Sequence, residues 1–144
     1  MMKRFLAALR SDQTAASAVE FALIGPAFLT MFLGVMQIGM GMQNYNALRS
    51  ISADTARWAV VNYQNSDKKT GIQMQNYAIS IATKAPYGLS KKDFEPLAKS
   101  LVLQRVNGAK EFEFTLKYNV PTFLAIIGID KIPISYTRPI FVLP

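Results

Sequence analysis

The sequence predicts an α+β fold: a long N-terminal transmembrane helix that continues into an exported helix, then a second helix and a small antiparallel sheet of three strands. Three observations predict it. No charged residue occurs from Phe21 to Met42, apolar residues recur at helical spacing beyond this run, and apolar and polar residues alternate strictly in "EFEFTLKYNV" (111–120). The chain has 144 residues, which suffices for one small domain and an anchor.

The apolar run has the length of a membrane span. As a helix, residues 21–42 would extend about 33 Å at about 1.5 Å per residue, which matches the hydrocarbon thickness of a bilayer. Pro26 removes one backbone hydrogen bond and is expected to kink or loosen this helix locally. Gly25, Gly34 and Gly39 are candidate positions for close approach of another helix.

Charges before the run predict its orientation. Lys3, Arg4 and Arg10 lie within the first twelve residues, where only Asp12 opposes them. By the positive-inside rule, the N-terminus is expected in the cytoplasm and everything after Met42 outside it.

The composition argues against an enzyme and against a metal or cofactor site. The chain contains no cysteine and no histidine, the commonest ligands of zinc and most transition metals. It has no glycine-rich phosphate loop and no indicated nucleophile–base pair, so no small-molecule substrate is expected. The net charge of +7 is spread out, without a basic stripe interleaved with aromatic residues, so nucleic acid is not an expected partner.

Two helices are expected before the sheet. The first continues to about residue 61, and the residues expected on its inner face are Leu48, Ile51, Thr55, and Trp58 or Ala59. A polar loop (62–71) separates it from an amphipathic helix (72–85). The segment 90–100 is expected to form a short turn, because Pro96 argues against a longer helix.

Three strands are expected after this turn. The first is the apolar run 101–106, joined by an Asn107-Gly108 turn to the second, 111–120. Glu111 and Glu113 are interpreted as solvated charges on its polar face. The third strand, 131–142, carries Pro133 and Pro139 on one side, which is typical of an edge strand.

The apolar stretch 123–129, between the last two strands, is too short to span a bilayer. It is expected to pack on the core, or else to enter the membrane surface or dock a partner.

The N-terminal segment resembles a known family. A short basic leader followed by "AASAVEFALIGP" (15–26) resembles the start of the TadE family, the minor pseudopilins of the tight-adherence (Tad or Flp) pilus. "GVMQIG" (34–39) and "ALRSISADTARWAVV" (47–61) are similar to later motifs of this family. Two positions depart from it: Ala15 stands where such leaders usually have glycine, and Gln37 replaces a frequent acidic residue.

The resemblance implies processing and assembly. A prepilin peptidase would cut between Ala15 and Ala16, so the chain would divide into a cytoplasmic leader (1–15), a membrane and assembly helix (16–61) and an exported domain (62–144). Glu20, followed by Phe21, would become the fifth residue of the mature chain and would meet the N-terminal amine of a neighbouring subunit. The implied partners are the peptidase, other pilins and pseudopilins, and the pilus assembly platform.

Physical chemistry is compatible with this role for Glu20. A carboxylate in lipid costs up to a few kcal/mol, less at the edge of the bilayer, and pairing with a cation offsets part of that cost. The alternatives are that Glu20 lies inert in the headgroup zone, that the chain is an unprocessed membrane-tethered binding protein, or that a secretory peptidase cuts before Val19. A membrane-bound hydrolase has the least support.

Overall fold

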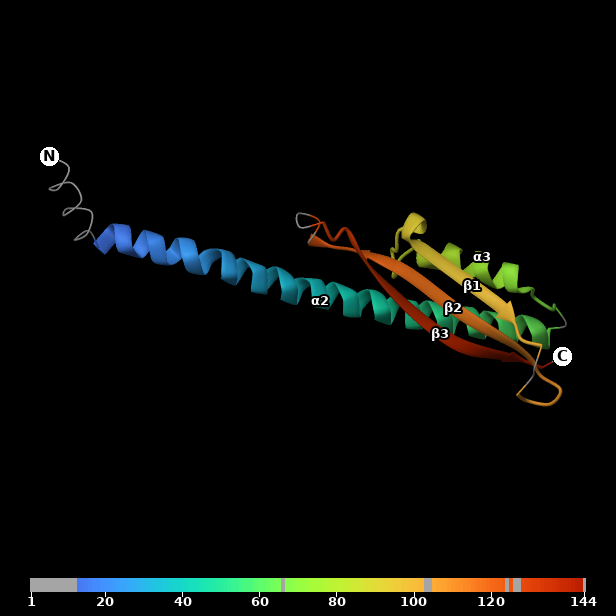
Figure 1. The fold of residues 1–144 in the computed structure, drawn as a ribbon. Helices are drawn as coiled ribbons and strands as arrows, with labels where there is room; N and C mark the ends of the chain where they lie inside the picture. The colour runs from blue at the N-terminus through green and yellow to red at the C-terminus, as the bar shows by residue number, and fades with distance from the viewer. Residues whose placement is uncertain (1–12, 66, 103–104, 124, 126–127, 144) are drawn as a thin grey trace, which may run out of the picture. The chain divides into compact units, whose positions relative to one another are not determined.

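The chain is described here by a computed structural model, which defines residues 13–65, 67–102, 105–123, 125 and 128–143, with side chains from residue 16 onward. The elements, in order, are the helices α2 (Gln13–Gln64) and α3 (Gly71–Ala82), the 3₁₀ turn η1 (Lys91–Asp93) and the strands β1 (Phe94–Ser100), β2 (Lys110–Pro121) and β3 (Lys131–Val142) (Figure 1). The predicted α+β fold is confirmed. The chain forms two compact units, one ending at Ile38 and the other beginning at Gly39.

Helix α2 runs through Pro26 without interruption. The hydroxyl of Thr30 donates a hydrogen bond to the carbonyl oxygen of Pro26, at 2.6 Å. Pro26 therefore lies inside a single helical segment, and any local loosening that it causes does not end the helix.

Helix α3 begins with a capping box. The Thr70 hydroxyl accepts from the Gln73 backbone N–H at 3.3 Å, and the Gln73 side-chain oxygen accepts from the Thr70 N–H at 2.9 Å. The helix ends at Ala82 rather than at the predicted residue 85, and it buries Met74, Ala78 and Ala82. The predicted second amphipathic helix is thus confirmed, with a shorter C-terminal end.

The sheet is antiparallel with the strand order β1-β2-β3. The central strand β2 buries alternate residues, as its sequence predicts, and β3 covers the predicted residues 131–142. Pro133 and Pro139 lie opposite Asn119 and Glu113, on the outer strand of the sheet. The prediction of β3 as an edge strand is confirmed.

The first strand was predicted in the wrong place. It is formed by Phe94–Ser100, whereas the described part of 101–109 is a loop. Pro96 is compatible with a strand here because β1 is the other edge of the sheet, where a missing N–H can face away from β2. The short turn predicted for 90–100 is restricted to η1.

The core of the second unit lies between the helices and one face of the sheet. Its fully buried side chains come from α2, α3, β2 and β3, and they include Leu48, Ile51, Met74, Phe114, Leu116, Val120 and Val142. The predicted inward positions Leu48, Ile51, Thr55 and Ala59 are buried, and Trp58 packs against the core at its margin.

Candidate functional site

The predicted assembly segment lies at the start of α2. Ala16, Glu20 and Phe21 are helical and exposed, and Phe21 keeps 77% of its surface accessible. The leader up to residue 12 lies outside the described residues, as does the side chain of Ala15. Within the described chain, Glu20 has no ion-pair partner, so any cation that neutralises it must come from elsewhere.

The rest of this segment is apolar and uncovered. Helix α2 contains a stretch long and apolar enough to cross a membrane, and that stretch is almost entirely exposed. Large apolar side chains are accessible around the whole helix: Leu23, Ile24, Phe28, Leu29, Met31, Phe32, Val35 and Ile38. This exposure is compatible with a membrane anchor, because lipid or other helices would cover these side chains.

The predicted helix-packing positions differ in the space around them. A Cβ atom added at Gly34 or Gly39 would meet no atom within 4 Å, whereas one at Gly25 would contact the Phe21 ring at 3.8 Å. Gly34 and Gly39 therefore leave open surface on α2, where a second helix has room to approach.

The side chain of Glu111 is buried, although it was predicted to be solvated. Its side chain is 0% exposed, and it accepts hydrogen bonds from Arg105: from the Nε atom at 2.8 Å, from Nη2, and from the backbone N–H at 3.3 Å. The loop before β2 thus folds back over this carboxylate. The Arg105 guanidinium lowers the pKa of Glu111 below its usual value, despite the opposing effect of burial. The interpretation as a solvated charge is wrong for Glu111, whereas Glu113 is exposed as predicted.

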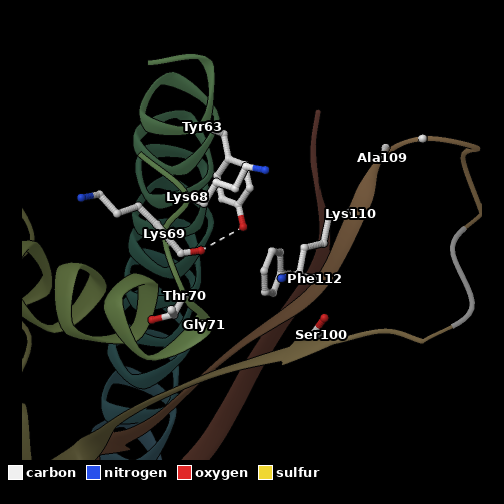
Figure 2. A pocket seen from close by; sticks show the side chains of 10 residues that line it. Tyr63, Lys68, Lys69, Thr70, Gly71, Ser100, Ala109, Lys110 and Phe112 are labelled. Carbon is white, nitrogen blue, oxygen red and sulfur yellow. Dashed lines mark hydrogen bonds between the residues drawn. The ribbon is translucent and has the colours of Figure 1, made fainter. Parts of the chain in front are cut away.

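A pocket of about 480 Å³ lies between the α2–α3 connection and the start of β2 (Figure 2). Tyr63 donates a hydrogen bond to the Lys69 carbonyl at 3.1 Å, and burial raises the pKa of this tyrosine. The Lys69 ammonium pairs with Asp67 and lies over the Trp58 ring. The described lining offers the cations of Lys68, Lys69 and Lys110 and the hydroxyls of Tyr63, Thr70 and Ser100.

A second pocket, of about 400 Å³, was not anticipated. It is lined by Asn46, Arg49, Ser50, Ala53, Tyr136 and Arg138. The available signal was Arg138, which interrupts the apolar even-numbered positions of the third strand. Its two arginines are considered further below.

The apolar stretch 123–129 is partly described. Phe123 and Ile129 each keep 44% of their surface accessible, and Ala125 is also exposed. Packing on the core, the favoured expectation, is wrong for these residues. The remaining expectations are contact with the membrane surface or with a partner. Among the described residues, no group of three or more Asp or Glu side chains is arranged to hold a metal ion.

Comparison with known proteins finds a family match for the N-terminal segment. Residues 15–57 match the family model whose description is TadE-like protein. The match covers the candidate cleavage junction, Glu20 and the apolar part of α2, and it associates the chain with the Tad pilus system. No curated protein and no solved structure matches the chain. Over residues 15–57 the predicted resemblance to the TadE family is confirmed.

Proposed function

We propose that this chain is a minor pseudopilin needed for assembly of a Tad/Flp-type adhesive pilus. One observation carries the proposal: in the segment that matches the TadE-like family, Glu20 directly precedes the uncharged part of α2, whose apolar side chains are exposed on all sides. Such a helix requires lipid before assembly and neighbouring helices after it. The chain would lie in the inner membrane with its N-terminus in the cytoplasm, and it would pass into the pilus or remain at its base.

Cleavage between Ala15 and Ala16 would create the partner that Glu20 lacks. An α-amine has an ordinary pKa near 8 and is mostly protonated at neutral pH. The amine of one subunit would pair with the Glu20 carboxylate of its neighbour, and the pair would favour a single register of the two helices.

The domain after the span would act by contact rather than by catalysis. Its central strand β2 carries exposed residues, Glu113 and Lys117 among them, between the buried ones, so the sheet offers a polar face for contact. We propose that the domain contacts other pilins and the assembly platform, without a cofactor, a small-molecule substrate or nucleic acid.

The first test is the N-terminal residue and the intact mass of the protein extracted from its own membranes. An N-terminus at Ala16 is the expected result. Retention of Met1 would contradict the proposal and identify an unprocessed, membrane-tethered binding protein. A start at Val19 would reveal a secretory peptidase and would also contradict the proposed register.

The second test concerns Glu20 itself. Glu20→Gln keeps the size of the side chain and removes its charge, so cleavage is expected to continue while pilus assembly fails. Glu113→Gln is the matched control, because Glu113 is an exposed carboxylate on the sheet. Normal pilus assembly in the Glu20→Gln strain, at normal protein levels, would show that the carboxylate is not required.

A further inference from the structure

Arg138 occupies a strand position at which the alternation of β3 favours an apolar residue. The even-numbered neighbours on the same face, Tyr136 and Ile140, belong to the core or pack against it. The residue opposite Arg138 on β2 is Phe114, which is fully buried. Arg138 itself is half-buried, so its guanidinium is partly removed from water and an anion nearby would stabilise it.

The chain does not provide this anion within its described residues. The pocket that Arg138 lines contains a second arginine, Arg49 of α2, and no carboxylate. Neither guanidinium has a salt bridge or side-chain hydrogen bond in the described part of the chain. By contrast, two other arginines of this unit, Arg57 and Arg105, are each paired with a carboxylate.

Two arginines in one pocket form a receptor for an oxyanion. Arginine remains charged in proteins, so an anion between the half-buried Arg138 and the exposed Arg49 would reduce the repulsion between them. The planar guanidinium matches a phosphate or carboxylate group through two parallel N–H donors. Asn46 and Ser50 add side-chain donors to the same lining.

The position of this pocket along α2 favours a lipid phosphate. Arg49 follows the last residue of the apolar run, Met42, by two helical turns, which is about 10 Å. Side chains of a helix lean toward its N-terminus, so the Arg49 guanidinium reaches back toward the end of the span. Tyr45, which lies on α2 between Met42 and Arg49, contacts the pocket residue Tyr136, with ring centroids 5.9 Å apart in an edge-to-face arrangement. Tyrosines are typical of the membrane–water interface.

We propose that Arg49 and Arg138 bind the phosphate of an anionic phospholipid headgroup at the outer surface of the membrane. The proposal depends on the membrane anchorage that is part of the proposed function. It adds a lipid contact that would fix the height and rotation of the domain over the bilayer before assembly. An anionic lipid is preferred to a zwitterionic one because no headgroup cation then competes with the two arginines.

The test uses the full chain in nanodiscs of phosphatidylcholine that contain phosphatidylglycerol. Native mass spectrometry would count the lipids that remain bound when the protein is released. We expect the wild-type chain to retain phosphatidylglycerol in preference to phosphatidylcholine. The double variant Arg49→Gln/Arg138→Gln should reduce this retention at least tenfold. Arg57→Gln is the matched control, since it removes an exposed arginine of the same helix, outside the pocket.

Several outcomes would overturn the proposal. Equal retention of the two lipids, or retention that the double variant leaves unchanged, would exclude a headgroup site. Binding of inorganic phosphate at the arginines without any lipid preference would identify a soluble anion instead. Loss of a co-purifying pilus subunit, with lipid retention unchanged, would identify a protein carboxylate as the ligand. Circular dichroism of each variant would verify that it is folded.

Failure of the proposed function would be recognised separately. If alkaline carbonate releases the wild-type chain from membranes, the anchor itself is absent. If the chain stays in the membrane but shows no lipid preference, only the headgroup site is refuted.

Discussion

The two parts of helix α2, before and after Met42, bury their apolar residues in different ways. Leu29, in the first part, keeps 58% of its surface accessible, whereas Leu48, in the second, is 0% exposed. The first part is apolar on all sides, and the second places its apolar residues on one face. One apolar face indicates a partner within the same chain, and apolarity all round indicates lipid or other subunits as the partner.

Glu20 and Glu111 also differ in where the counter-charge of their carboxylate comes from. Glu111 is buried and receives its counter-charge from Arg105, six residues earlier in the same chain. Glu20 is exposed, and no residue of the described chain neutralises it. A carboxylate whose counter-charge lies in the same chain contributes to folding. A carboxylate whose counter-charge comes from another subunit contributes to assembly.

The strongest test of the comparison is truncation of a leucine in each part of α2. Leu48→Ala is expected to lower the free energy of unfolding of the second unit by about 2–5 kcal/mol, because it leaves a cavity in the core. Leu29→Ala should change this free energy by no more than about 0.5 kcal/mol. Denaturant titration of the full chain in detergent would measure both. Similar losses for the two variants would refute the distinction between the two parts of α2.

A smaller effect is expected for a pair of glycines. A Cβ atom at Gly71 would lie 2.9 Å from the carbonyl oxygen of Ala98, so Gly71→Ala must displace α3 from β1 at a cost of about 1–3 kcal/mol. Gly34→Ala meets no atom of the chain and should leave the stability of the second unit unchanged. If Gly34 is a contact between helices, the same variant should weaken pilus assembly. Thermal unfolding and a count of surface pili would separate these effects.

The third expected effect depends on pH and concerns Glu111. Arg105 holds the pKa of Glu111 below its unfolded value, and Lys131 does the same for Asp93. The unfolded chain therefore binds more protons at acidic pH, so the stability from these pairs is complete above the ordinary carboxyl pKa of about 4. It is lost as the pH falls through the lower, folded values.

Glu111→Gln should therefore lower stability at pH 7 and have a diminishing effect as the pH falls below about 4. Glu113→Gln is the control, since Glu113 is exposed on the same strand. Unfolding curves at a series of pH values would measure the difference between the two variants. A loss for Glu111→Gln that stays the same from pH 7 to pH 2 would show that packing, not charge, explains it.

Much of the fold could be predicted because its signals are local. The alternation in β2, the spacing of apolar residues in α3 and the uncharged run in α2 each depend on neighbouring residues, and each element is present. The first strand was misplaced because "LVLQ" is the more apolar segment, and Pro96 was considered only as an argument against a long helix. That reasoning did not anticipate that β1 is an edge strand, where Pro96 is tolerated.

Of the candidate functional residues, only those within the family motifs could be predicted from the sequence. Ala16 and Glu20 were identified from the residues around them, and the family match covers both. Burial of Glu111 was missed, because alternation indicates which face a side chain occupies but not whether a loop covers that face. Arg49 on α2 and Arg138 on β3 line the same pocket although they are far apart in the sequence. A pattern of neighbouring residues cannot predict such a contact.

The smallest expected effect concerns Thr55, whose side chain is on the inner face of α2 as predicted. Its hydroxyl and that of Ser52 are fully buried, and neither has a hydrogen-bond partner among the described residues. Thr55→Val replaces this hydroxyl with a methyl group of similar size and should raise the free energy of unfolding by about 1 kcal/mol. Thr115→Val is the matched control, because the Thr115 hydroxyl shares a hydrogen bond with Thr137 at 2.9 Å. That variant should be neutral or slightly destabilising. If Thr55→Val instead lowers stability, the hydroxyl has a partner in solution, such as a bound water, and the inner face of α2 is less dry than its apolar neighbours indicate.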